Sequence, residues 1–382
     1  MHIITTTQEL ADFAAALRER PFVAVDTEFM REKTYWPILC LIQAAAEGLE
    51  AIIDPLADGI DLTPFHEVLA DASVTKVFHA ARQDVEIFFQ MTGAAPNPLF
   101  DTQVAAMACG YGDQVGYEPL MRNLLNASID KGSRFTDWAR RPLTDKQLTY
   151  ALSDVTYLRE AYPIILEQLD DGGRHAWVAE EMQQLADASL YNTAPEDAWR
   201  RLKLRGVRPP ELGPLIKVAA WREREAQRRN VPRARIAKDD AIYELARMRP
   251  KSAEDLSRAR STPKGFERSA QGAALLKAVA EGVAMEKADL PRIERNNNRP
   301  PPPSDVVELL KVLLKRQCEE YKVAPRLIAS SSDLEELALN VNADIPAMNG
   351  WRREVFGDRA QALMEGRLAM RLVGKKLELV DL

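Results

Sequence analysis

The stretch FVAVDTEFMRE, residues 22–32, places two carboxylates inside a run that otherwise reads as a buried β-strand. Residues i and i+2 of a strand point to the same face, so Asp26 and Glu28 are expected to project together. Two such carboxylates in a dry strand repel each other and lose hydration. A divalent cation such as Mg²⁺ or Mn²⁺ would relieve both costs, because these ions prefer oxygen ligands. The alternative is an exposed strand end with a solvated pair.

The overall composition is that of a globular protein. A chain of 382 residues allows two or three domains, and 46% hydrophobic with 28% charged residues is ordinary for this class. No run approaches the roughly 20 apolar residues of a membrane span, and the N-terminus lacks the pattern of a signal peptide. The three cysteines are far apart, which argues against a disulfide framework and a clustered zinc site. We expect a cytoplasmic monomer without membrane association.

Charge is distributed unevenly along the chain. Residues 1–199 hold 14 Lys and Arg against 31 Asp and Glu, a net of −17. Residues 200–288 hold 22 against 11, a net of +11, and residues 289–382 hold 15 of each. A basic segment in an acidic protein suggests nucleic-acid binding. A solvated helical surface is the alternative explanation.

The sequence predicts an α/β domain over residues 1–200, followed by helical domains. FVAVDTEF, LCLIQAA and LEAIIDPL resemble strands of an antiparallel meander, LTPFHEVLAD a helix and TKVFHA a further strand. Helical spacing dominates from Asp84 onward, which indicates a mixed sheet flanked by helices. No convincing strand is expected after about residue 203. The remaining chain is divided into helical domains at 206–287 and 304–375, with an extended Pro- and Asn-rich linker at 288–303.

The two helical segments resemble each other. VPRARIAKDDAIYELA at 231–246 aligns with VAPRLIASSSDLEELA at 323–338 at a constant offset of 92, which indicates a degenerate internal repeat. Chance similarity between short helical pieces is the alternative. The second copy is the poorer match, because it has Leu313 where the first has Trp221.

Further acidic residues occur where a metal site would need them. KVFHAARQDVEIFF places Asp84 just beyond a strand, in the first turn of a predicted helix, where the helix dipole alone could also favour it. LTYALSDVTYL places Tyr150 and Asp154 four residues apart, on one helical face. Asp154 lies in an apolar stripe, and no Lys or Arg occurs between Lys146 and Arg159. A metal ion is a natural partner for its charge.

This pattern resembles the DEDD-type 3′→5′ exonucleases in their tyrosine variant, with D-x-E on a first strand, a mid-domain Asp and Y-x-x-x-D on a late helix. TYWPILCLIQ, HAARQD and FDTQVAA are similar to the flanking segments of bacterial ribonuclease D, and both helical repeats resemble its helicase-and-RNase-D C-terminal (HRDC) domains. WREREAQRRNVPRARI is the most typical piece. The resemblance covers nearly the whole chain and implies a mixed-sheet, ribonuclease-H-like exonuclease domain followed by two small all-α domains.

The resemblance also implies a mechanism. By this resemblance, the protein would hydrolyse the terminal phosphodiester of an RNA 3′ end with two divalent ions, Mg²⁺ or Mn²⁺, and release nucleoside 5′-monophosphates. Asp26 would bridge both ions, Glu28 and Asp154 would complete one site, and Asp84 would support the other. Tyr150 would position the attacking water, since the ordinary tyrosine pKa of about 10 makes it a poor base at neutral pH.

Other candidates are less specific. Phe29 could stack on a terminal base or, by strand alternation, pack in the core. His79 could contact a phosphate or sugar, or be a satisfied structural histidine. Arg228, Arg229 and Arg233 are candidate RNA contacts, and a helix continuing to Pro232 would place Arg222, Arg229 and Arg233 on one face. Gln43 lies at the end of an apolar strand that faces the region of the carboxylates, and we assign it no role.

Transfer-RNA precursors are the substrate class that the resemblance implies. A DNA 3′→5′ exonuclease is one competing hypothesis, because proofreading domains share the carboxylates. A catalytically silent RNA-binding scaffold is the other, although a scaffold has no physical reason to keep four converging carboxylates. The chain has no G-x-x-x-x-G-K-[ST] phosphate loop, so it is not itself a helicase.

Overall fold

A computed structural model of the protein describes residues 2–129, 132, 136–192, 194–204, 206–291 and 300–382. Its backbone contacts divide the chain into two compact units, which we describe separately. Unit 1 comprises residues 1–28, 40–188 and 299–382, and unit 2 comprises residues 29–39 and 189–298. The predicted linker at 288–303 lies partly outside the described residues, because 292–299 are not among them.

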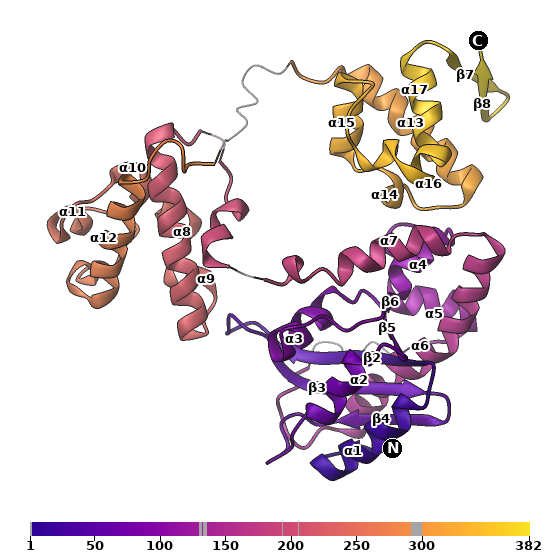
Figure 1. The fold of residues 1–382 in the computed structure, drawn as a ribbon, viewed down its shortest axis with the longest axis horizontal. Helices are drawn as coiled ribbons and strands as arrows, with labels where there is room; N and C mark the ends of the chain where they lie inside the picture. Colours follow the sequence, from indigo (N-terminus) through magenta and orange to yellow (C-terminus); the bar gives the residue numbers. More distant parts are fainter. Residues whose placement is uncertain (1, 130–131, 133–135, 193, 205, 292–299) are drawn as a thin grey trace. The chain divides into compact units, whose positions relative to one another are not determined.

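A six-stranded mixed sheet forms the centre of unit 1 (Figure 1). The strand order is β1-β4-β3-β2-β5-β6; β3 pairs antiparallel with β4, whereas the pairs β1–β4, β2–β5 and β5–β6 are parallel. The predicted meander is therefore present in the order β4-β3-β2, and the short strands β1 and β6 extend it. The strands are β1 (Ile3–Ile4), β2 (Phe22–Met30), β3 (Ile38–Ala46), β4 (Leu49–Ile53), β5 (Thr75–Phe78) and β6 (Leu99–Asp101).

The α-helices described over residues 2–188 flank this sheet: α1 (Thr7–Arg18), α2 (Thr63–Ala70), α3 (Arg82–Thr92), α4 (Thr102–Ala108), α5 (Tyr117–Leu125), α6 (Asp145–Asp171) and α7 (His175–Leu185). Ala24 of β2 and Ala45 of β3 belong to the same apolar cluster as Val155 and Leu158 of α6. One sheet face is therefore covered by α6. A capping box between Thr144 and Gln147 sets the start of this long helix, which carries two of the predicted site residues.

Unit 2 contains the first helical repeat. Its helices are α8 (Pro209–Arg229), α9 (Arg233–Ile236), α10 (Asp239–Met248), α11 (Ala253–Ser257) and α12 (Ala270–Val283), preceded by the 3₁₀ helix η3 (Pro195–Arg201). Trp221, Ile242 and Leu275 lie in one buried cluster. Gly213 and Gly282 allow α8 and α12 to touch, because a Cβ on Gly213 would lie 2.1 Å from the carbonyl oxygen of Gly282.

The second repeat belongs to unit 1 and contains α13 (Ser304–Tyr321), α14 (Pro325–Ile328), α15 (Ser331–Leu339), α16 (Gly350–Arg352) and α17 (Asp358–Met364). It ends in an antiparallel hairpin of β7 (Leu368–Val373) and β8 (Lys376–Asp381). The expectation of no strand after residue 203 was wrong. This hairpin is short and largely exposed, so its apolar pattern is weak, and its turn uses Gly374 at φ 62°.

The two repeats begin with the same succession of helices, α8-α9-α10 in the first and α13-α14-α15 in the second. Helix α9 starts at Arg233 and α14 at Pro325, while α10 starts at Asp239 and α15 at Ser331, and both pairs are 92 positions apart. The long helices α8 and α13 end at left-handed residues, Asn230 at φ 47° and Lys322 at φ 50°. The internal repeat in the sequence thus corresponds to a repeated structure.

Within unit 1 the second repeat packs against α4 and α7. The Arg174 guanidinium donates to the carbonyl of Lys322 at 3.0 Å, and the Ala324 amide donates to the carbonyl of Met107 at 2.9 Å. Trp177 and Trp351 stack with ring centroids 4.2 Å apart and planes 8° apart. A Cβ on Gly110 would lie 2.8 Å from the carbonyl oxygen of Lys322, so only glycine fits this close approach. The glycine-containing loop after α4 is therefore a docking site.

Among the described helices, none is both long enough and apolar enough to span a membrane.

Candidate active site

Strand β2 and helix α6 bring three carboxylates together in unit 1. One oxygen atom from each of Asp26, Glu28 and Asp154 lies within 4.8 Å of the other two. Asp26 and Glu28 share one face of β2 because strand side chains alternate, and α6 lies over that face. All three residues are partly buried. We call this set the carboxylate cluster.

Within this cluster the protein disfavours charge on Asp26 when no cation is bound. Desolvation first, and then the charge of Asp154, raise the pKa of Asp26 well above its ordinary value. The Tyr117 hydroxyl donates to the backbone carbonyl of Asp154 at 2.6 Å. Burial, followed by the charges of Asp154 and Asp26, raises the pKa of Tyr117, so this phenol stays neutral.

Asp84 lies beside the cluster in the first turn of α3, as predicted. It is buried and accepts a hydrogen bond from the Thr27 hydroxyl. Burial first, and then the charge of Asp26, raise its pKa well above the ordinary value. Thr27 was not recognised as part of the site from the sequence, because strand alternation turns it away from Asp26 and Glu28. Its role depends on the position of α3.

Tyr150 lies one turn before Asp154 on α6, at the predicted spacing. Its ring stacks on Trp138, with centroids 6.2 Å apart and planes 28° apart. Trp138 is buried and was not singled out in the sequence. This packing restricts the orientation of the Tyr150 ring.

The structure favours a structural role for His79. Its Nδ1 lies 3.0 Å from the Thr102 hydroxyl, and its Nε2 lies 3.1 Å from the carbonyl oxygen of Val115. Both ring nitrogens are thus engaged within unit 1. Phe29, at the end of β2, is half-buried, which distinguishes neither stacking on a base nor core packing.

The predicted arginine face of the first repeat does not form. Helix α8 ends at Arg229, so Arg233 begins α9 instead of continuing α8. Arg222 is buried and pairs with Asp239 at 2.6 Å. Arg233 Nη2 donates to Glu223 at 2.7 Å and to the Tyr35 hydroxyl at 3.0 Å. Among the three candidate RNA contacts, only Arg228 and Arg229 are exposed, and Arg228 also pairs with Glu225.

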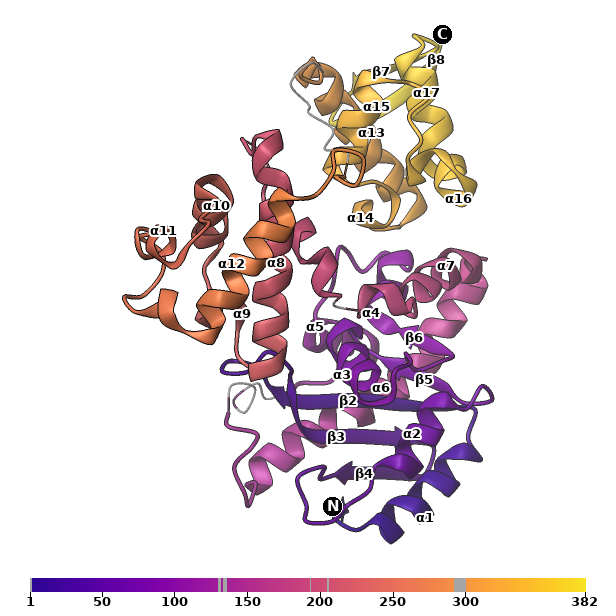
Figure 2. The ribbon, with the colours of Figure 1, turned by 60° about the vertical axis from the view of Figure 1, so that its left-hand side comes forward.

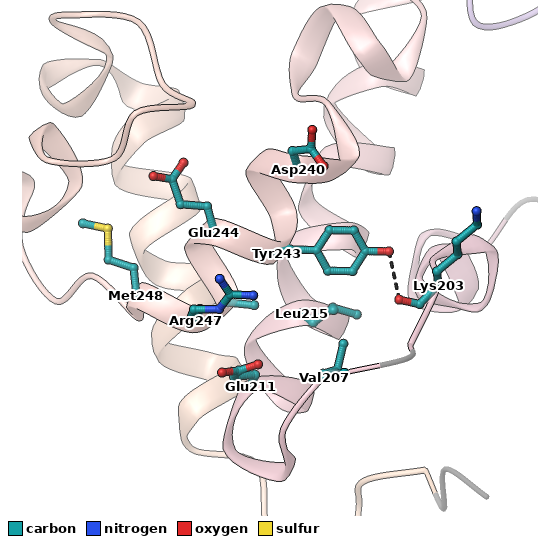
Figure 3. Close-up of a pocket in the computed structure, with 11 residues that line it drawn as sticks. Lys203, Val207, Glu211, Leu215, Asp240, Tyr243, Glu244, Arg247 and Met248 are labelled. Atoms are coloured by element: carbon teal, nitrogen blue, oxygen red, sulfur yellow. Dashed lines mark hydrogen bonds between the residues drawn. The ribbon is translucent and has the colours of Figure 1, made fainter. Parts of the chain in front are cut away.

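Unit 2 has a hollow with a volume of about 680 Å³ beside α10 (Figure 3). The hydroxyl of Tyr243 donates to the carbonyl of Lys203 at 3.0 Å across it. Glu211, Asp240 and Glu244 line it together with the cations Lys203 and Arg247. Because both signs of charge are present, the hollow is not a basic groove for a phosphate backbone.

The carboxylate cluster fits a divalent cation site. Its donors are carboxylate oxygens, the ligands that Mg²⁺ and Mn²⁺ prefer. Mutual repulsion in a desolvated site raises the pKa of Asp26, and a bound cation would reverse that cost. Asp84 offers a fourth carboxylate beside the other three.

The comparisons with known proteins agree with this geometry. A family model described as a 3′-5′ exonuclease matches residues 1–170, and a model described as an HRDC domain matches residues 215–279. Ribonuclease D of Granulibacter bethesdensis is 48% identical over 379 residues, covering 99% of this chain and 96% of that protein. Ribonuclease D of Nitrobacter hamburgensis is 49% identical over 372 residues, covering 97% of each.

A solved structure extends the similarity to the whole fold. The crystal structure of Escherichia coli RNase D, described as an exoribonuclease involved in structured RNA processing, superposes with a TM-score of 0.81 at 30% identity. The match covers 96% of this chain and 98% of that chain. Sequence and fold together show that the chain belongs to the ribonuclease D family of 3′→5′ exoribonucleases.

Proposed function

We propose that the protein trims structured RNA, including transfer-RNA precursors, from the 3′ end and releases nucleoside 5′-monophosphates. The observation that carries this proposal is the convergence of Asp26, Glu28 and Asp154 within 4.8 Å, with Asp84 alongside. The Escherichia coli relative, described as acting in structured RNA processing, supports the substrate class.

Two divalent ions, Mg²⁺ or Mn²⁺, would supply electrostatic stabilisation of the attacking and leaving oxygens when bound. Asp26 would hold both ions, because it lies with Glu28 and Asp154 and also acts electrostatically on Asp84. Glu28 and Asp154 would complete one site, and Asp84 the other. Thr27 fixes the Asp84 carboxylate through its hydroxyl, which keeps this ligand in place before cations arrive.

Tyr150 would orient the attacking water toward the terminal phosphodiester. Its hydroxyl is carried one turn from Asp154, and stacking on Trp138 restricts the ring. We assign positioning to Tyr150 because an ordinary phenol has a pKa of about 10 and rarely ionises at neutral pH.

The exposed basic residues of unit 2 would hold the body of the RNA. Arg228 and Arg229 lie in the last turn of α8, and Arg235 of α9 is exposed as well. Phosphate contacts made by such residues release counterions and give salt-dependent affinity. Arg233 is assigned to the structure of the repeat, because Glu223 and Tyr35 bind it.

The direct test is a digest of 5′-labelled RNA and DNA of one sequence, each a hairpin with a 3′ tail. We expect single-nucleotide shortening of the RNA tail in Mg²⁺ or Mn²⁺, 5′-monophosphate products and no cleavage in chelator. Faster cleavage of the DNA would favour the competing DNA exonuclease. Tight RNA binding without cleavage under any metal condition would favour the silent scaffold.

A further inference from the structure

We propose that Gln43 is a positioning residue for the carboxylate cluster, whose amide binds water retained there when the cluster holds its cations. This inference rests on the proposed metal-dependent function. It concerns a residue that no sequence motif assigned to the reaction. It rests on the sheet face that carries Gln43, on the helix over that face, and on the lack of a partner for the amide among the described residues.

The strand register places Gln43 on the same side of the sheet as the cluster. In β3 it pairs with Ile52 of β4, within an uninterrupted antiparallel register, so Gln43 and Ala45 point the same way. Ala45 lies in the apolar cluster that contains Ala24 of β2. Ala24, Asp26 and Glu28 alternate onto one face of β2, the strand next to β3.

Helix α6 covers this part of the sheet. Its Asp154 joins Asp26 and Glu28 in the carboxylate cluster, and its Arg159 Nη1 lies 3.4 Å from the carbonyl oxygen of Ala46, at the end of β3. Tyr162, further along α6, contacts the ring of Phe22 at the start of β2, with centroids 4.7 Å apart. The helix thus lies over β2 and reaches the end of β3, and Figure 2 shows these two strands side by side in the sheet.

The Gln43 amide has no partner among the protein groups that the structure describes. The residue is fully buried, and neither Nε2 nor Oε1 makes a hydrogen bond there. A buried amide left in this state carries a desolvation penalty, so such groups are uncommon and usually have a function. The amide therefore calls for a partner other than these protein groups.

The surroundings indicate where that partner lies. A buried water needs two to four polar neighbours. The neighbouring side chains on this face are apolar and buried: Leu41 and Ala45 of β3 and Val155 of α6. The carboxylate cluster supplies polar atoms on this face. Water bound between the amide and the cluster would satisfy both. An amide suits this role, because it can donate and accept at once and does not titrate.

The test compares Gln43→Met with Leu41→Met, a matched apolar change on the same face of the same strand. Thermal unfolding of the full-length variants is followed in chelator and during Mn²⁺ titration without RNA, and turnover is measured on a tailed hairpin. We expect Gln43→Met to unfold at or above the wild-type temperature in chelator. Its Mn²⁺ affinity and turnover should fall by about 10- to 100-fold, a typical range for residues that orient metal ligands. Leu41→Met should retain the wild-type Mn²⁺ affinity and turnover.

Wild-type Mn²⁺ affinity in Gln43→Met would overturn the proposal, whether or not its stability in chelator falls, since the amide would then serve only the core. If Gln43→Met does not fold, Gln43→Asn decides, because it keeps an amide but withdraws it by one methylene. It should bind Mn²⁺ more weakly, and wild-type affinity would again overturn the proposal. If Mn²⁺ does not shift the unfolding temperature of the wild-type protein, the proposed metal-dependent function itself is refuted.

Discussion

The carboxylate cluster of unit 1 and the network around Glu223 in unit 2 both place charge inside the protein, but they stabilise it differently. Asp26, Glu28 and Asp154 are like charges gathered together, and their repulsion raises the pKa of Asp26. Glu223 is removed further from solvent, at 1% exposure, but it binds Arg233 and Tyr35. Burial alone would raise the Glu223 pKa, but these hydrogen bonds hold it below its ordinary value.

The difference separates charge that serves the reaction from charge that serves the fold. A buried carboxylate that pairs with a cation needs nothing further, whereas a group of carboxylates that repel one another is costly unless a cation arrives. Changes in the carboxylate cluster should therefore affect turnover and spare stability, and changes in the Glu223 network should do the opposite. The following predictions test that distinction.

Asp26→Asn should produce the largest effect. Turnover on a tailed hairpin RNA should fall by several orders of magnitude at saturating metal, because the one carboxylate proposed to hold both ions loses its charge. In chelator the variant should be at least as stable as wild type, since repulsion with Asp154 is relieved. Single-turnover kinetics and thermal unfolding measure the two quantities. Asp58→Asn, at an exposed site, is the control, and near-wild-type activity of folded Asp26→Asn would refute the assignment.

Tyr150→Phe should lower turnover by about 10²- to 10³-fold, as expected when one positioning hydrogen bond in an active site is lost. The stacking on Trp138 is kept, so stability should change little. RNA affinity is measured in chelator and single-turnover cleavage in metal. Tyr157→Phe on the same helix controls for loss of a hydroxyl. A collapse of affinity with unchanged chemistry would make Tyr150 a docking residue.

Asp84→Asn should change the pH dependence of stability in chelator. The folded pKa of Asp84 is raised, so above the unfolded value of about 4 the unfolded chain loses this proton while the folded protein keeps it, and this difference disfavours folding. The free energy of unfolding of wild type, relative to Asp84→Asn, should therefore fall as pH rises from about 4, by about 1.4 kcal/mol per unit of pKa difference. Denaturant unfolding across this range measures it. Saturating Mn²⁺ should abolish the trend.

Arg233→Met should destabilise the first repeat by roughly 1–3 kcal/mol. This is less than the loss expected on breaking a fully buried ion pair, because Arg233 is partly exposed and Arg201 still pairs with Glu223. Hydrogen exchange of the α8 amides and thermal unfolding measure this. Arg235→Met on the same short helix is the control, since Arg235 is exposed. Cleavage of a very short single strand should be unchanged. A normal stability with weakened RNA binding would instead restore Arg233 as an RNA contact.

The smallest effect is expected from Arg228→Ala combined with Arg229→Ala. If both contact phosphates, the slope of log affinity against log salt for a tailed hairpin should shrink by roughly 1.4–1.8, about 0.7–0.9 for each contact. Lys375→Ala with Lys376→Ala removes the same charge from the exposed C-terminal hairpin and should leave the slope unchanged. An unaltered slope in the arginine variant would identify these arginines as a solvated surface.

The sequence by itself determined the features that depend on short spacing. The D-x-E pair shares a strand face because side chains alternate, and Tyr150 lies one turn from Asp154 because a helix has about 3.6 residues per turn. Asp84 was correctly placed in a first helical turn, and the offset of 92 correctly aligned the two repeats. These relations involve neighbours within one element or a repeated pattern, so they need no knowledge of packing.

Only the tertiary structure decided which distant groups meet. Thr27 binds Asp84 from 57 positions away, and Tyr35 binds Glu223 from 188 positions away. The end of α8 at Arg229 removed Arg233 from the predicted basic face, and packing against α7 gave the second repeat a structural role. The sequence shows each charge, but its partner depends on how the elements pack. The partner determines whether a buried charge stabilises the fold or requires a bound cation.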